Sequence, residues 1–312
     1  MKQKFLFSTL SVILLLSLLS CIAEVKYPSV ESVSISPDEI TTLEIRQSQK
    51  FTATVHGENN PPKSVTWGVT GNNSSTTIID SNGLLSVALD ETSGTLIVNA
   101  ASSFDPSKIG EASVNVVIGV GGKITFGAYQ WRVLDIQDDM ALILCENIIL
   151  LHEYHISNVS ITWTDCSLRA YLNGEFYNSN AFSNEDRSRI VEVTNINENN
   201  QWFGTNGGPD TQDKIFLLSI AEVVQYFGDS GQLANRPSGA SWIDDQYNSN
   251  RIATFYGVVT SWYLRSPGIF TYDAVNVGGD VDGEGFIYMV GTHVYRSSGV
   301  RPALWLDISS MK

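Results

Sequence analysis

Apolar and polar residues alternate through residues 31–118, and turn-forming residues interrupt the alternation at short intervals. A period of two is typical of half-buried β-strands, whose side chains point alternately to the core and to water. The predicted strands are Val33-Ser-Ile35, Phe51-Thr-Ala-Thr-Val55, Val65-Thr-Trp67, Leu96-Ile-Val98 and Ala112-Ser-Val-Asn-Val116, with turns at Asn82-Gly83 and Ser93-Gly94. Because no long helical stripe interrupts it, the pattern predicts an all-β sandwich with Trp67 as its central aromatic residue.

The periodicity becomes mixed in residues 123–308, after a glycine-rich stretch at residues 119–122 that indicates a short flexible joint. A first helix is predicted to end at Phe176 and to begin at Thr164 or Asp165, either of which can cap its first turn. A second helix is predicted over residues 182–191, with Ser183 as its cap and Asp186 near its positive end. A third is predicted over residues 220–227. Strands are predicted over residues 124–134, 140–146, 214–219, 262–264, 274–277, 287–290 and 303–306. The second domain is therefore predicted to be α+β, with much irregular backbone.

Two short blocks of similar composition frame a different segment near the C-terminal end. Trp262-Tyr-Leu-Arg-Ser-Pro-Gly268 and Gly299-Val-Arg-Pro-Ala-Leu304 each combine apolar residues with one arginine and one proline. A buried guanidinium must be hydrogen-bonded, and proline fixes a turn, so both blocks are expected to be structural. The residues assigned this role are Trp262, Leu264, Arg265, Pro267, Gly268, Gly299, Arg301 and Pro302, and Trp131, Trp163 and Trp305 are also expected in the core.

Residues 269–298, between the two blocks, are rich in Gly, Asp, Asn, Val and Tyr, and we expect them to form an irregular insert. Binding residues lie preferentially on loops held by a packed scaffold, so we expect this insert to present a ligand-binding surface. Tyrosine and asparagine give large or adaptable contacts, as they do in antibody loops. The expected contact residues are Phe270, Tyr272, Asp273, Asn276, Asp280, Asp282, Tyr288, Tyr295 and Arg296. The expected partner is an extracellular protein or a glycan.

The first twenty residues have the pattern of an export signal, with Lys2 and Lys4 before an apolar run that is too short for a transmembrane helix. Ser20 followed by Cys21 resembles a bacterial lipobox, in which the cysteine is lipidated and becomes the new N-terminus. Acyl chains on Cys21 would anchor the protein to a membrane, with residues 21–30 as a tether. The alternative to lipidation is an ordinary cleaved signal with a chance cysteine. With the lipid, we expect an outer-membrane or cell-surface location.

Acidic residues outnumber basic ones, 33 to 19, which leaves a net charge of −14. Because nucleic-acid affinity depends on phosphate neutralisation by Lys and Arg, this balance argues against a nucleic-acid partner. Cys145 and Cys166 are the cysteines other than Cys21, and they could form a disulfide in an exported protein or remain two separate buried thiols.

Motifs for catalysis or cofactor binding are weak in this chain. His152 and His155 lie three residues apart rather than the four of a zinc-protease helix, and residues 280–285 are too few for a calcium loop. We therefore expect no metal, no cofactor and no enzymatic activity. A remote alternative is an enzyme acting on envelope polysaccharide with a carboxylate pair such as Asp213 and Asp244, which no motif supports.

The first domain resembles the bacterial Ig-like domains of surface proteins. The resemblance lies in Ser32-Val-Ser-Ile-Ser-Pro37, Phe51-Thr-Ala-Thr-Val55, Val65-Thr-Trp67, Ile79-Asp-Ser-Asn-Gly-Leu84 and Val98-Asn-Ala-Ala101, and it covers nearly the whole domain. Such a resemblance implies a spacer or stalk.

Residues 123–308 resemble one family of bacterial extracellular domains of unknown function. The matching segments are Trp131-Arg-Val-Leu-Asp135, Thr162-Trp-Thr-Asp-Cys-Ser-Leu-Arg169, Asp213-Lys-Ile-Phe-Leu-Leu-Ser219 and the two framing blocks. That family resembles the C-type lectin-like fold, which implies a ligand-presenting face in residues 269–298 and, by a further analogy, diversification of this segment by a retroelement. The chain is thus expected to be a surface lipoprotein with a non-catalytic adhesin-like or receptor-like domain; the alternative is a structural cell-envelope spacer or assembly protein.

Overall fold

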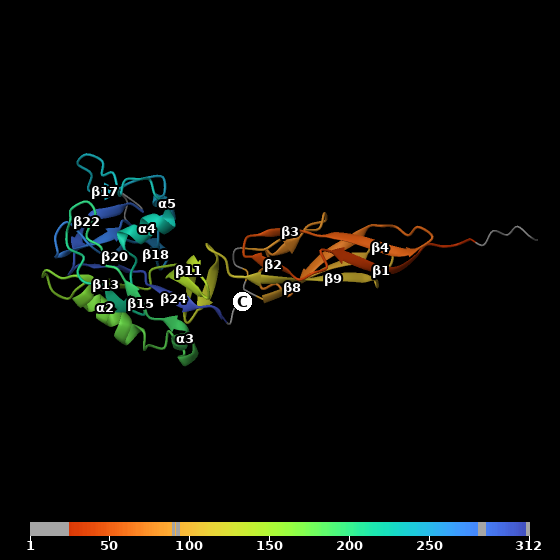
Figure 1. The fold of residues 1–312 in the computed structure, drawn as a ribbon, viewed down its shortest axis with the longest axis horizontal. Coiled ribbons are helices and arrows are strands. Elements are labelled where there is room, and N and C mark those ends of the chain that lie inside the picture. Colours follow the sequence, from red (N-terminus) through yellow and green to blue (C-terminus); the bar gives the residue numbers. More distant parts are fainter. Residues whose placement is uncertain (1–24, 89–90, 92–93, 280–284, 310–312) are drawn as a thin grey trace, which may run out of the picture.

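The computed structural model describes residues 25–88, 91, 94–279 and 285–309, arranged as two lobes placed end to end (Figure 1). The expected export signal, Cys21 and two of the expected contact residues, Asp280 and Asp282, lie outside the described residues. In the described part of the chain, no helix is long and apolar enough to cross a membrane.

The first lobe consists of strands alone. They are β1 (Ser29–Ser36), β2 (Thr41–Glu44), β3 (Ser48–Lys50), β4 (Thr52–Glu58), β5 (Val65–Thr70), β6 (Ile78–Ile79), β7 (Leu84–Ser86), β8 (Gly94–Ser102) and β9 (Ile109–Val117). They form sheets in the orders β2-β9-β8-β5, β1-β4 and β3-β7-β6. Every strand predicted here from alternation is present, because each has one apolar face to bury against a shared core.

The prediction that Trp67 is the central aromatic residue of this lobe is wrong. Phe51 is fully buried, whereas Trp67 is only partly buried. Trp67 lies on β5, an edge strand of the four-stranded sheet, and its ring packs against the turn at Gly83. An edge strand has less sheet around it to cover a large ring, so the core forms around Phe51 instead.

The glycine stretch between the lobes is packed on both sides, contrary to the predicted flexible joint. The backbone N–H of Gly121 donates to the carbonyl of Val133 (2.8 Å), and the N–H of Val133 donates to Gly122 (2.9 Å). A Cβ on Gly119 would lie 2.9 Å from the Glu44 carboxylate of the first lobe. Glycine is needed here because two lobes approach its backbone closely.

Two sheets form the second lobe. The five-stranded sheet has the order β10 (Lys123–Phe126), β11 (Tyr129–Gln137), β12 (Met140–Cys145), β24 (Ala303–Asp307) and β14 (Ile190–Val191). The six-stranded sheet has the order β13 (Leu150–Glu153), β23 (Ser297–Val300), β20 (Trp262–Pro267), β21 (Asp273–Val277), β22 (Ile287–His293) and β17 (Trp242–Ile243). Two small hairpins pair β15 (Val193–Asn195) with β16 (Thr211–Asp213), and β18 (Thr254–Phe255) with β19 (Val258–Val259).

The helices of this lobe are short. They are η1 (Trp163–Asp165), α2 (Ser167–Tyr171), the π-helical η2 (Leu172–Phe176), α3 (Asn184–Arg189), α4 (Ile220–Phe227) and α5 (Asn248–Arg251). The predicted cap at Ser183 and the predicted helix at Ile220–Phe227 are confirmed, but the helix after Ser183 ends at Arg189, and Ile190 and Val191 form β14. The single helix predicted up to Phe176 is instead three segments, and its cap is Cys166, whose sulfur accepts from the Arg169 N–H, rather than Thr164 or Asp165.

Residues 214–219, predicted as a strand, form an extended strap that joins the two sheets. Phe216 makes an isolated bridge with Ala303 of β24, while the carbonyl of Leu218 accepts from the N–H of Arg265 in β20 (2.9 Å). The Asn173 side chain accepts from the N–H of Lys214 (2.8 Å) and donates to the carbonyl of Ile215 (2.8 Å). A side chain and two different sheets therefore satisfy the backbone that a strand ladder would have paired.

The strands predicted over residues 274–277 and 287–290 are present, and with them the described part of residues 269–298 is more regular than the predicted irregular insert. They supply β21, β22 and the start of β23, inside the six-stranded sheet. All five residues of β21 are buried, and Ile287, Met289 and Gly291 of β22 are buried in alternation. Among the described residues of this segment, the outward positions of β22 and the turns beside these strands remain to present a surface.

The arginines of the framing blocks staple backbone, as expected. Arg265 donates to the carbonyls of Leu217 (2.8 Å) and Ile196 (3.3 Å) and pairs with the Glu222 carboxylate. Arg301 donates to the carbonyls of Cys145 (2.9 Å) and Glu146 (3.1 Å), and burial lowers the pKa of its guanidinium to about 10. Trp131, Trp163 and Trp262 are fully buried, and Trp305 is partly buried.

Cys145 and Cys166 are both buried free thiols, so the disulfide alternative is not realised. Burial raises the pKa of each thiol to about 12, which keeps both protonated at neutral pH. We expect a thiol reagent to leave residues 25–312 unmodified in the native state and to label both cysteines after denaturation. Rapid labelling of native protein, measured by mass spectrometry, would contradict this burial.

Candidate functional site

A groove of about 410 Å³ lies on the outer face of the six-stranded sheet. The residues that define its chemistry are Phe270, Tyr272, Asp273, Tyr288, His293 and Arg296. Phe270 and Tyr272 come from the turn between β20 and β21, Tyr288 and His293 from β22, and Arg296 from the turn that leads into β23. The groove is thus built by one hairpin and the two turns beside it.

Backbone hydrogen bonds hold the two turns against each other. The N–H of Ile269 donates to the carbonyl of Val290 (2.7 Å), and the N–H of Val294 donates to Tyr272 (3.0 Å). Gly268 is required at the start of this turn, because a Cβ there would lie 2.2 Å from the carbonyl oxygen of Val290. Beneath the second turn, the buried Tyr263 hydroxyl donates to the carbonyl of Arg296 (2.8 Å). The side chains above are therefore presented by a fixed backbone.

Four rings form a continuous row along one wall of the groove. Phe270 stacks on Tyr272 with centroids 5.0 Å apart, and Tyr272 lies 5.7 Å from the imidazole of His293. His293 stacks on Tyr295 at 5.7 Å and 16°, and the Arg296 guanidinium lies 5.2 Å from the centroid of the Tyr295 ring. Phe270 and His293 are exposed and Tyr272 and Tyr295 are partly exposed, so the row is accessible from solvent. Such a row can bind a ligand by stacking.

A carboxylate and an imidazole form the polar centre of the groove. Asp273 is 5% exposed, and its Oδ1 lies 2.6 Å from Nδ1 of His293, whose side chain is 48% exposed. Burial raises the pKa of Asp273 above its usual value, and the hydrogen bond from His293 only partly offsets this effect. Asp273 therefore orients His293, leaving the imidazole Nε2 to meet a polar group of a ligand.

The structure brings most of the expected contact residues together. Phe270, Tyr272, Asp273, Tyr288 and Arg296 line the groove, and Tyr295 joins them through its stack on His293. Asn276 is placed differently: it is buried on β21, and its side-chain oxygen accepts from the Thr292 hydroxyl (3.1 Å). It supports the sheet under the groove instead of facing a ligand.

Sequence reasoning missed His293 and the aromatic residues at the far end of β22. Trp242 lies 6.5 Å from Tyr288 and Phe286 lies 6.3 Å from it, by ring centroids. The alternation of buried Ile287 and Met289 could have placed Tyr288 and Phe286 on the outer face. No comparable signal existed for Trp242, because β17 is two residues long and pairs with β22 across more than forty residues of chain.

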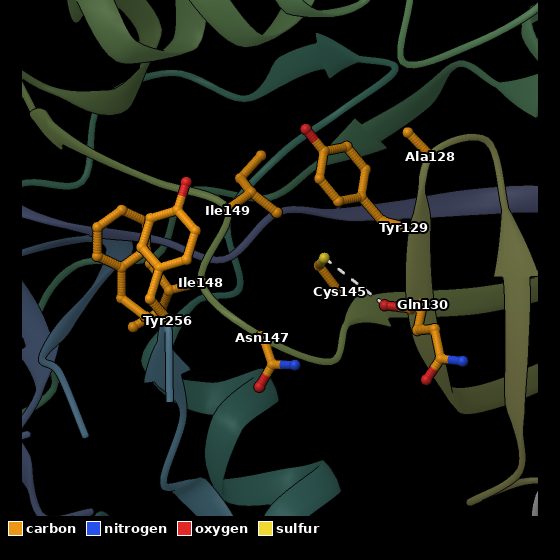
Figure 2. Close-up of a pocket in the computed structure, with 9 residues that line it drawn as sticks. Ala128, Tyr129, Gln130, Cys145, Asn147, Ile148, Ile149 and Tyr256 are labelled. Carbon is orange, nitrogen blue, oxygen red and sulfur yellow. Dashed lines mark hydrogen bonds between the residues drawn. The ribbon is translucent and has the colours of Figure 1, made fainter. Parts of the chain in front are cut away.

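A second pocket, of about 540 Å³, lies where the chain passes from β12 to β13, and Figure 2 shows Ile149 between the rings of Tyr129 and Tyr256. The Cys145 thiol faces the carbonyl of Gln130 at 3.7 Å, and the described lining contains no charged side chain. It offers less directional chemistry than the groove, so the groove is the stronger candidate site.

Asp213, one carboxylate considered for polysaccharide hydrolysis, is a structural hub. It is fully buried and accepts hydrogen bonds from Trp163 (3.0 Å), Arg169 (2.6 Å), Asn195 (3.0 Å) and Thr211 (2.6 Å). A carboxylate so enclosed cannot meet a substrate. Across the described ranges, no cluster of three or more His, Cys, Asp or Glu side chains could hold a metal ion.

Three comparisons place this chain among known proteins. A family model described as a domain of unknown function, DUF6273, matches residues 138–308. None of the curated proteins matches the sequence. Among solved structures, the chain is similar to the surface layer protein SbsC (domains 1–6), with 15% sequence identity and a TM-score of 0.23. That similarity covers 41% of this chain and 20% of the other chain.

Proposed function

Since the chain belongs to the family of the domain of unknown function DUF6273, whose model spans all the groove residues, we propose that this domain is a non-catalytic receptor for an extracellular ligand. In this proposal the protein is a lipoprotein anchored through Cys21. The first lobe is an Ig-like stalk, and the second lobe, with a C-type lectin-like fold, presents the groove. The observation that carries the proposal is the accessible row of four rings, in which the buried Asp273 carboxylate holds the imidazole of His293.

The arrangement of this row indicates that its rings bind a ligand rather than stabilise the fold. Rings that stabilise a core are buried on both faces, whereas Phe270 is 50% exposed and lies beside a groove. Solvent exposure of several aligned rings has a cost that burial by a partner removes. Tyr, His and Arg also combine large contact area with hydrogen-bonding groups, the composition typical of binding sites.

The groove lacks the parts of a nucleophilic catalytic site among its described residues. Among the described lining residues Thr292 is the one Ser, Thr or Cys, and its hydroxyl donates to the side-chain oxygen of Asn276 on the same sheet. The Asp273–His293 pair therefore has no adjacent nucleophile to activate. Recognition of a ligand, with His293 and Arg296 as polar contacts, is the use that this geometry supports best.

The test is binding of residues 25–312 to glycan and host-protein arrays, beside the double variant Tyr272→Ala, Tyr295→Ala. We expect the double variant to lose at least about ten-fold in affinity, because truncating two central aromatic contacts removes more than about 1.4 kcal/mol. Its melting temperature should stay close to that of the native protein, since both rings are partly exposed and lie outside the hydrophobic core of the lobe. Affinity would be measured by biolayer interferometry on each array hit.

Tyr256→Ala is the matched control, because this tyrosine is 91% exposed and lies outside the groove. It should bind as the native protein does. A large drop in melting temperature for the double variant would show that the rings belong to the core. Silence on both arrays from well-folded protein would favour the structural alternative, a cell-envelope spacer or assembly protein.

A further inference from the structure

The aromatic surface continues beyond the groove along the outer face of the six-stranded sheet. Tyr288 lines the groove, and its ring also neighbours Trp242 at 6.5 Å and Phe286 at 6.3 Å. Trp242 and Phe286 lie 5.8 Å apart, and Trp242 is 47% exposed. The three rings form a second platform, here called the tryptophan platform, that shares Tyr288 with the groove.

The two platforms lie at opposite ends of β22. Trp242 pairs with Tyr288 near the beginning of the strand, and His293 is its last residue. From Ile287 to His293, β22 runs opposite Val277 to Asp273 of β21, and those four steps of extended backbone correspond to roughly 13 Å. A ligand that contacts both platforms must therefore be long and must present stackable faces at both ends.

Charge and pairing restrict the chemistry of such a ligand. The chain carries a net charge of −14, and the groove lining holds one carboxylate, Asp273, and one guanidinium, Arg296, so it offers a polyanion no excess of cations. An extended peptide usually adds to a free strand edge. Here the outer edge of β22 is occupied, because Ile287 and Tyr288 pair with β17 and the N–H of Val290 donates to Ser241 (3.3 Å). Recognition must come from side chains.

A neutral oligosaccharide has the matching chemistry. Pyranose rings present C–H groups that pack on the electron-rich face of an aromatic ring, and their hydroxyls pair with imidazole, guanidinium and phenol groups. The groove supplies His293, Arg296 and Tyr272 for those hydroxyls, while the tryptophan platform supplies mainly ring faces. We propose that the site binds a neutral oligosaccharide lengthwise along β22, with its polar end unit in the groove and a later unit on Trp242. This inference rests on the proposed function.

The dependence of affinity on the length of the oligosaccharide provides the decisive experiment. Residues 25–312 would be titrated by calorimetry with the dimers and hexamers of β-1,4-linked glucose and of β-1,4-linked N-acetylglucosamine, and with an anionic hexagalacturonate. We expect a hexamer to bind at least about ten-fold more tightly than its dimer, and more tightly than hexagalacturonate. Trp242→Ala should weaken the hexamer about ten-fold and change the dimer less than about two-fold. Trp242→Phe should retain most of the hexamer affinity, because it keeps a stacking face.

His293→Ala is the companion variant, and it should weaken dimer and hexamer alike because both occupy the groove. Equal affinity for dimer and hexamer, or equal losses for both in Trp242→Ala, would overturn the lengthwise arrangement. Suppose that no neutral sugar binds, but that a protein on the array binds and loses its binding in the Tyr272→Ala, Tyr295→Ala variant. This result would overturn the proposed sugar ligand and would support the proposed receptor function. Silence of sugars and proteins together would overturn both.

Discussion

Asp213→Ala is expected to lower the free energy of unfolding of the second lobe by about 3–5 kcal/mol, the usual result of breaking a buried ion pair from one side. Asp213 is fully buried, and its two oxygens accept from one guanidinium, one indole, two amides and one hydroxyl, donated by Arg169, Trp163, Asn195, Asn173 and Thr211. Alanine leaves these donors without an acceptor, and a buried donor that is unsatisfied carries its full desolvation cost.

Chemical denaturation followed by tryptophan fluorescence measures this loss. Glu192→Ala is the control, because Glu192 is an exposed carboxylate between β14 and β15, and its loss should change stability by no more than about 0.5 kcal/mol. If Asp213→Ala keeps native stability, the hub does not hold the lobe together.

Acidification is expected to weaken the second lobe by roughly 2 kcal/mol through Glu146 alone. Burial raises the pKa of Glu146, but Arg132 and Lys123, at 2.8 Å and 3.0 Å, outweigh burial and lower the pKa from 4.5 to about 2. A depressed carboxyl pKa gives stability that is present above about pH 4.5 and is lost as the pH falls towards 2. The full shift would give more, but the side chains of Arg132 and Lys123 are a third exposed, so water screens the pair.

The measurement is the free energy of unfolding at pH 6 and pH 3 for the native protein and for Glu146→Gln. Glutamine cannot ionise, so the variant should be less stable at pH 6 and should lose less on acidification. Equal losses in both proteins would assign the acid sensitivity to other carboxylates.

Local signals explain which parts of the fold were predictable. The capping box of α3 needs only Ser183 and Asp186, three residues apart, and α4 begins at a second box formed by Ser219 and Glu222. Residues 214–219 have an equally clear apolar pattern, but their partners are Asn173, Ala303 and Arg265, which come from three distant segments. A pattern of burial does not say whether a ladder or a set of separate contacts satisfies the backbone.

The candidate site also has a part that the sequence predicts and a part that depends on distant contacts. Phe270, Tyr272 and Tyr295 were identified because they lie near the framing blocks, and the structure gathers them into one row. Trp242 belongs to the same surface only because β17 pairs with β22, a contact that no sequence spacing records. Asn276 was misplaced although a strand over residues 274–277 was predicted, because the spacing does not show that both faces of β21 are buried in the centre of the sheet.

The packed glycine joint has a mechanical consequence for an anchored chain. Because Gly121 and Gly122 are hydrogen-bonded to Val133, a pull on a bound ligand passes from the second lobe directly into β9. In the proposed form anchored through Cys21, the opposing pull enters at the far end of β1, at the other end of the first lobe (Figure 1). The two forces act along the strands in opposite directions, so they load the ladders of the first lobe in shear. In that geometry the hydrogen bonds between β1 and β4 resist together, and traction on the groove is borne by a whole strand at once.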